Sequence, residues 1–297
     1  MFFVKIITSL PLHRMSFLLA AVFLFSLNNV LWKKNLTNSS TEFLVCYRAV
    51  FTSLFSWSAL FLFLPSFSVS LSDYLKITLG SVLGTIGLFS MLFFLKKSSL
   101  QWVGIYNLIG IAITTLYVWI FEKVELSSVL FGGAFILVGF GWFLKINSTN
   151  SFRLTMHQHA LLFLMTAAFS SASLIHWKNL TNEVSPLVII SNQESIVFFI
   201  SLLLLIQKNK FDRIRHDLLS NFRSIAFMSF ILLAAFTCSL MGLKVTNPVV
   251  SGMIFLASPL TTILFSSYFF KEKITWQHWL AISLLSMGAF LLHEQAN

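Results

Sequence analysis

Long apolar runs, separated at regular intervals by short charged or polar stretches, make up most of the chain. An α-helix needs about 20 mainly apolar residues to cross a hydrocarbon layer of about 30 Å, so the pattern predicts ten membrane-spanning helices. Their approximate ranges are Met15–Trp32, Phe43–Leu64, Leu75–Leu95, Trp102–Phe121, Ser127–Leu144, Ala160–Trp177, Pro186–Ile206, Ile225–Leu243, Val249–Phe270 and Trp276–Leu292. The longest connection, Gln207–Arg223, is basic and amphipathic, and we expect it to lie on the membrane surface.

Composition excludes a water-soluble protein. Of the 297 residues, 57% are hydrophobic and 10% are charged, whereas soluble domains carry about 25% charged residues. The apolar runs are continuous and not alternating, which excludes a β-barrel. The sequence therefore predicts an all-α integral membrane protein.

The two halves of the chain repeat each other. Three short segments recur in the same order, at offsets that drift from 144 to 150 residues. They are Asn35–Asn38 with Asn179–Asn182, Leu95-Lys96 with Leu243-Lys244, and Phe121–Val124 with Lys271–Ile274. We therefore expect two five-helix repeats, residues 1–146 and 147–297.

Five crossings per repeat is an odd number, so the second copy would enter the membrane from the opposite face. Inverted repeats of this kind are typical of secondary transporters, because they supply two nearly equivalent states that open to opposite sides. A bundle that arose by duplication and serves as a non-transporting scaffold is the alternative.

The end of each repeat carries a recognisable pattern, in which an acidic residue precedes a glycine-containing final span. In the first repeat Glu122 precedes Gly132, Gly133, Gly139 and Gly141, and in the second Pro259 precedes Glu272 and Gly288. With Arg48 early in the second span, the chain resembles the EamA-like branch of the drug/metabolite transporter (DMT) superfamily. The resemblance implies a ten-helix inner-membrane permease that moves small metabolites, often amino acids or related compounds, outward. The repeats differ where Ile109-Gly110 stands in place of Ser258-Pro259.

Polar side chains inside predicted spans are the candidate substrate-binding residues, because they are costly in lipid and usually face the bundle interior. They are Tyr47, Arg48, Tyr106, Asn107, Asn192, Gln193 and Glu194. Glu194 lies roughly 12 Å into its span, so it is either protonated or paired with a cation from another span. It could couple protons, bind a substrate ammonium, or simply pack the bundle. Arg48 either extends to the interface or faces the cavity as an anion partner.

Two other positions are ambiguous. Asn28 and Asn29 lie near the end of the first span, where they are either interfacial or inward-facing, and we expect only one of them to point inward. His176 stands beside Trp177 near a span end, which favours a residue of the interfacial belt over a ligand or proton carrier.

No enzymatic motif is present: the sequence has no His-Glu-x-x-His, Gly-x-Ser-x-Gly or phosphate-binding loop. We expect no catalytic residue, cofactor, metal or nucleic-acid partner, and a monomer in the lipid bilayer that acts on a small-molecule substrate. The net charge of +10 comes from basic residues between the spans. A nucleotide-sugar or phosphorylated-metabolite exchanger is a further alternative, but it should need several inward-facing cations, and only Arg48 lies within the spans.

The orientation of the chain stays open. Basic residues divide 13 against 6 between the two faces, which places both termini outside. The family resemblance implies both termini inside.

Overall fold

A computed structural model describes residues 16–36, 40–64, 68–96, 98, 100–122, 127–147, 154–207, 214–258, 261–262, 264–265, 268 and 276–295. These residues form helices and short connections, with no strand among them. The helices are α2 (Ser16–Leu36), α3 (Thr41–Phe63), α4 (Leu71–Leu95), α5 (Leu100–Glu122), α6 (Ser127–Asn147), α7 (Met156–Thr181), α8 (Pro186–Gln207), α9 (Ile214–Val245), α10 (Pro248–Phe255) and α12 (Trp276–Gln295).

The all-helical, membrane-embedded class is confirmed. Among the described residues, six helical segments are long and apolar enough to cross a membrane: α2, α3, α4, α7, α8 and Phe222–Val245 of α9. Helices α5 and α6 contain shorter apolar stretches, Ile109–Glu122 and Phe131–Trp142. Large side chains such as Leu62, Phe61 and Phe121 are exposed, as expected for a surface that faces lipid.

Polar side chains fix where several helices begin. The hydroxyls of Ser40 and Ser70 accept hydrogen bonds from backbone N–H groups three residues further along the chain, and Thr155 forms a reciprocal capping box with Gln158. Asn247 caps α10 by accepting from two backbone N–H groups at 3.0 Å. Each cap satisfies N–H groups that the first helical turn leaves without a partner.

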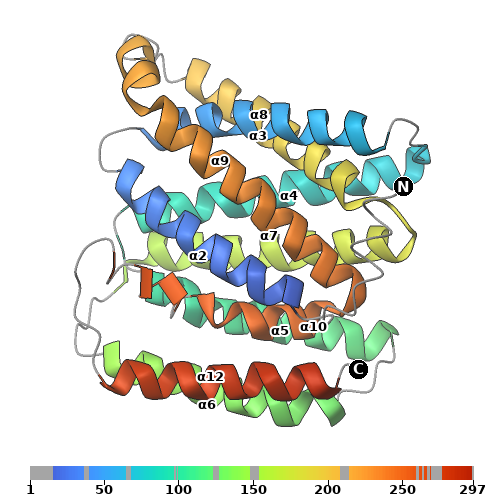
Figure 1. Ribbon diagram of the computed structural model, residues 1–297, viewed down its shortest axis with the longest axis vertical. Helices are drawn as coiled ribbons and strands as arrows, with labels where there is room; N and C mark the ends of the chain where they lie inside the picture. Colours follow the sequence, from blue (N-terminus) through green and yellow to red (C-terminus); the bar gives the residue numbers. More distant parts are fainter. Residues whose placement is uncertain are drawn as a thin grey trace.

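The most extensive helix contacts join the first half of the chain, α2 to α6, to the second half, α7 to α12. Helix α6 packs on α12, α4 on α7, α3 on α8, and α2 on α9, while α5 packs on α10. Figure 1 shows α6 and α12 together along one edge of the bundle and α3 with α8 toward the other. The two halves are therefore interleaved, and neither is a separate compact unit.

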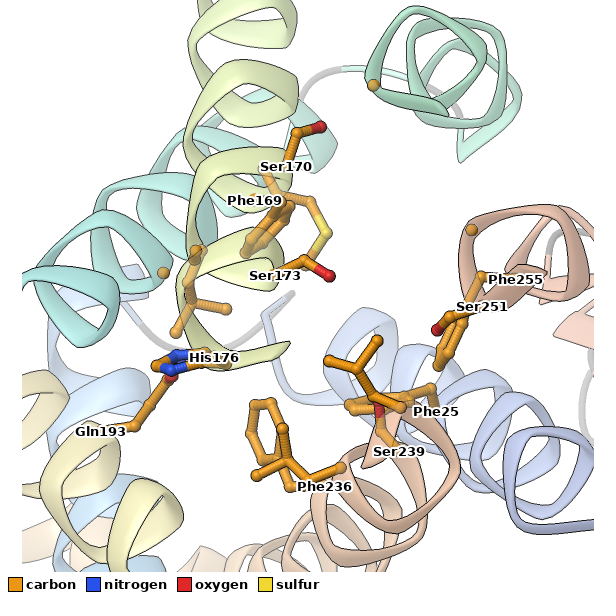
Figure 2. A pocket seen from close by; sticks show the side chains of 18 of the residues that line it. Phe25, Phe169, Ser170, Ser173, His176, Gln193, Phe236, Ser239, Ser251 and Phe255 are labelled. Carbon is orange, nitrogen blue, oxygen red and sulfur yellow. The ribbon is translucent and has the colours of Figure 1, made fainter. Parts of the chain in front are cut away.

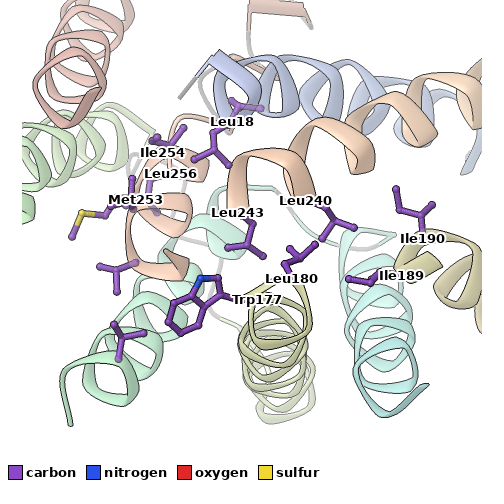
Figure 3. Close-up of a cluster of buried hydrophobic side chains, with 14 of the residues drawn as sticks. Leu18, Trp177, Leu180, Ile189, Ile190, Leu240, Leu243, Met253, Ile254 and Leu256 are labelled. Atoms are coloured by element: carbon purple, nitrogen blue, oxygen red, sulfur yellow. The ribbon is translucent and has the colours of Figure 1, made fainter. Parts of the chain in front are cut away.

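The largest apolar cluster lies where α2, α7, α8, α9 and α10 meet (Figure 3). Trp177 and Leu180 of α7 contribute to it together with Leu240 and Leu243 of α9. This cluster surrounds the ends of α7 and α9 and holds the neighbouring polar side chains in place.

The segment Gln207–Arg223, which we predicted to lie on the membrane surface, is helical from residue 214 onward as the first part of α9. Helix α9 is continuous over 32 residues, which is about 48 Å at about 1.5 Å per residue. A helix of that length exceeds the hydrocarbon thickness, so its first turns extend the eighth predicted span beyond the lipid core. Residues 208–213, Pro259 and Glu272 lie outside the described residues.

Helices α6 and α12 approach closely at Gly288. A Cβ atom placed there would lie 2.6 Å from Cγ1 of Ile136 and 2.8 Å from the backbone oxygen of Gly132. Since that backbone cannot move aside cheaply, Gly288→Ala should destabilise the protein by about 1–3 kcal/mol. The thermal unfolding midpoint of detergent-purified protein measures the change.

Gly141→Ala is the matched control, because a Cβ at Gly141 meets no described atom within 4 Å. An equal fall in the midpoint for both variants would contradict the close contact between α6 and α12.

Candidate functional site

A cavity of about 370 Å³ lies between the two halves and is lined by residues of α2, α3, α4, α5, α7, α8, α9 and α10. Four phenylalanines and four serines form much of its wall: Phe25, Phe169, Phe236, Phe255, Ser170, Ser173, Ser239 and Ser251 (Figure 2). The ring centroid of Phe25 lies 5.3 Å from that of Phe236 and 5.7 Å from that of Phe255. The cavity is thus largely apolar, with hydroxyl groups from several helices.

A buried ion pair lies in the wall of this cavity. Nη2 of Arg48 on α3 is 3.0 Å from Oε2 of Glu194 on α8, and each side chain is 1% exposed. The hydroxyl of Thr52 donates to the same carboxylate oxygen, and the Arg48 guanidinium lies over the Trp32 ring, 5.8 Å from its centroid. Glu194 is therefore paired with a cation from another span, and Arg48 does not extend to the interface.

The ion pair leaves some hydrogen-bonding capacity unused. Nε and Nη2 of Arg48 and Oε1 of Glu194 have no hydrogen-bond partner among the described atoms. The 3.0 Å approach of Nη2 to Oε2 is an ion pair without hydrogen-bond geometry, so their attraction is mainly coulombic. Both side chains line the cavity, but these atoms are themselves buried, so a polar molecule in the cavity reaches them only when the surrounding side chains move.

His176 also lines the cavity, against the expectation of an interfacial residue. It is 6% exposed, and its Nε2 lies 3.1 Å from Oε1 of Gln193 on α8. The expectation was wrong because α7 continues to Thr181, which places His176 more than one turn inside the helix. In addition, Gly80 on α4 leaves room for the imidazole ring.

Four of the seven predicted site residues line the cavity, namely Arg48, Asn107, Gln193 and Glu194, and three do not. Tyr47 packs between Phe43 and Phe51. The Tyr106 hydroxyl is 2.5 Å from Nδ1 of His159. The Asn192 amide donates to the Thr78 hydroxyl at 3.3 Å and lines a second pocket, of about 450 Å³, formed mainly by α3, α4 and α8.

The structure adds residues that sequence reasoning missed or placed differently. Asn28 and Asn29 both line the cavity, so the expectation that only one points inward is wrong. Small polar residues recur along the helix that carries Ser170 and Ser173, but this sequence pattern indicates close helix packing as well as a binding site. Ser239 and Ser251 are isolated serines in apolar spans and gave no usable signal. The described residues contain no group of three or more His, Cys, Asp or Glu that could hold a metal.

Two further ion pairs lie near the ends of α5, α7 and α9. Glu122 pairs with Lys178 of α7, and Glu183, in the turn between α7 and α8, binds Lys244 at 2.7 Å. The hydrogen bond from Lys244, and then its positive charge, lower the pKa of Glu183. These contacts link three helices at one end of the bundle.

Comparison with known proteins detects a known domain in the second half of the chain. A search of curated sequences finds no match. One crystal structure of another protein aligns with a TM-score of 0.74 at 14% identity, over 94% of this chain and 96% of that one, which shows a shared fold. The sequence of residues 158–293 matches the EamA-like transporter family. An EamA-like transporter family domain is thus detected in residues 158–293, and this match is consistent with the predicted resemblance to the drug/metabolite transporter superfamily.

Proposed function

We propose that the protein is a secondary transporter that moves a small metabolite across the cytoplasmic membrane by alternating access. In this proposal ten crossings form two inverted five-helix repeats, residues 1–146 and 147–297, and the central cavity binds the substrate. The observation that carries the proposal is a cavity lined by both halves, with a charge pair contributed by one helix of each half. The transporter family of residues 158–293 supports it.

The pattern of helix contacts supports the repeat. If the two halves are copies of one unit, α2 corresponds to α7, α3 to α8, α4 to α9, α5 to α10, and α6 to α12. Under this correspondence the contacts of α3 with α8, α5 with α10 and α6 with α12 map onto themselves. The contact of α4 with α7 maps onto that of α9 with α2, and the contact of α4 with α8 maps onto that of α9 with α3. An accidental bundle has no reason to keep this correspondence.

One pair of side chains repeats in detail. Asn35 and Asn179 are 144 residues apart, at the offset found in the sequence. The Asn35 amide donates to the Leu31 carbonyl at 2.8 Å, and the Asn179 amide donates to the Ile175 carbonyl at 2.9 Å. Both side chains are buried. The same local bond at equivalent positions supports a common structural unit.

The charge of the cavity favours a substrate without net charge. Among the described lining residues, Arg48 and Glu194 carry the only full charges, and they compensate each other. A net-charged molecule would enter this low-dielectric site without an excess counter-charge, which is costly. We therefore propose an uncharged or zwitterionic metabolite, such as an amino acid or a related compound, over a phosphorylated one.

Metabolite release from cells that contain or lack the protein tests this function. We expect selective release of one net-neutral compound, which is then confirmed by flux in proteoliposomes. Release of a phosphate ester or nucleotide would contradict the neutral substrate. A correctly inserted protein that releases nothing would favour the non-transporting scaffold.

Glu194 is the proposed proton-coupling carboxylate. Glu194→Gln should weaken the pH dependence of transport in proteoliposomes, because the amide cannot exchange a proton, while membrane insertion is retained. Unchanged pH dependence would remove Glu194 from proton coupling.

Replacing only one partner of the Arg48–Glu194 ion pair should lower the stability of the folded protein. Arg48→Gln and Glu194→Gln each leave one buried charge without its partner, at a cost of about 3–5 kcal/mol. The double variant Arg48→Gln/Glu194→Gln has no buried charge and should recover most of the lost stability. Thermal unfolding in detergent measures all three proteins, and additive losses in the double variant would show that the two charges do not interact.

A further inference from the structure

The two halves carry equivalent contacts that differ in chemistry. Trp32 and His176 are 144 residues apart, and their partners Arg48 and Gln193 are 145 apart. In the first half the Trp32 ring lies against the Arg48 guanidinium, and in the second the His176 ring binds the Gln193 amide. Each contact joins the first two described helices of its half. Only the second contains an imidazole, the side chain that titrates near neutral pH when it is free in water.

The two contacts lie toward opposite ends of the bundle. Trp32 is four residues before the end of α2, and His176 is five residues before the end of α7. In Figure 1, α2 ends and α3 begins at the left, whereas α7 ends and α8 begins at the right. The helix ends next to Trp32 and His176 therefore lie on opposite sides of the bundle, while Arg48 and Gln193 come close together at its middle through the pair of Arg48 with Glu194.

Helix α4 closes tightly over the His176–Gln193 contact. A Cβ atom on Gly80 would lie 2.8 Å from Cε1 of His176, and one on Gly84 would lie 2.7 Å from Nε2 of Gln193. Figure 2 shows the imidazole and the Gln193 side chain side by side between the helices. Nδ1 of His176 is buried and has no hydrogen-bond partner among the described atoms. The closed arrangement thus suits a neutral ring with Nε2–H donated to Gln193.

A second proton on His176 would find no acceptor in this arrangement. Four pairs of charged groups are described on the surrounding elements: Glu194 of α8 with Arg48 of α3, Asp73 with Lys76 on α4, Lys178 of α7 with Glu122 of α5, and Lys244 of α9 with Glu183. A buried imidazolium without a counter-charge or hydrogen-bond acceptor is strongly disfavoured. Protonation is therefore coupled to hydration of the ring, which requires α4 to separate from α7 and α8.

We propose that His176 is a proton-binding site that opens one end of the cavity, the end where α7 meets α8. Acidic pH favours the open form there, because water then hydrates the imidazolium. The opposite end, held by the Trp32–Arg48 contact, does not respond to pH in this range. This inference rests on the proposed inverted-repeat transporter and adds a proton site distinct from Glu194.

Thiol labelling from each side of the membrane tests the proposal. The variant used for labelling carries Cys46→Ala and Cys238→Ala, which remove the two natural cysteines. It also carries Ser173→Cys, which places a single reporter thiol in the cavity wall. A membrane-impermeant maleimide is added to right-side-out and inverted vesicles between pH 5.5 and 7.5. His176→Phe in the same background keeps a ring over Gly80 but cannot bind a proton, so it corrects for the pH dependence of the thiol itself.

Relative to the His176→Phe control, acidification should raise labelling about fivefold from the face at the α7–α8 end, and leave labelling from the other face unchanged. Gln193→Glu should suppress the acid effect, because a carboxylate beside the ring holds the imidazolium in place. Gln193→Ala should raise labelling from the same face already at neutral pH. Equal pH profiles with and without His176, or an acid effect from both faces, would overturn the proposal.

Thiol labelling detects opening of the cavity even when no substrate is transported. The His176 proposal and the transporter proposal can therefore be contradicted independently. Metabolite release with no pH effect on labelling removes the His176 site and keeps the transporter. A one-sided acid effect in a protein that releases no metabolite removes the transport function alone.

Discussion

The ion pair between Arg48 and Glu194 is the constraint on which the rest of the structure depends. Two full charges in a membrane-embedded interior are tolerated only when each compensates the other. Arg48 lies on α3 and Glu194 on α8. The need to pair the two charges therefore fixes how far α3 and α8 are shifted along each other. The cavity is formed around that fixed pair, and in the proposed function its charge balance favours a molecule without net charge.

Close approach between the halves is the second requirement, and small residues provide it. Lipid gives helices no hydrophobic reason to associate, so backbone proximity and polar contacts must stabilise the bundle. Gly80 and Gly84 bring α4 against the His176–Gln193 contact, and Gly288 brings α12 against α6. Since the principal contacts cross between halves, a local change in one half alters the wall contributed by the other.

Positions that the proposed repeat makes equivalent are similar in some contacts and different in others. Asn35 and Asn179 make the same backbone contact, yet Trp32 and His176 bring different chemistry to the two ends of the cavity. Such differences make the two halves unequal, and this inequality is what would allow a proton to act on one end alone in the proposed mechanism.

The sequence by itself determined the class and most helix positions, and four of the seven residues that it predicted for the site line the cavity. The length of an apolar run and the cost of a polar group within it are local properties. The tertiary structure decided which faces of the helices meet. A span that is apolar all round carries little information about its rotation, so Tyr47 and Asn192 could not be told from Arg48 and Gln193. The partnership of Arg48 with Glu194 and the burial of His176 depend on helices far apart in the chain, and no local pattern encodes them.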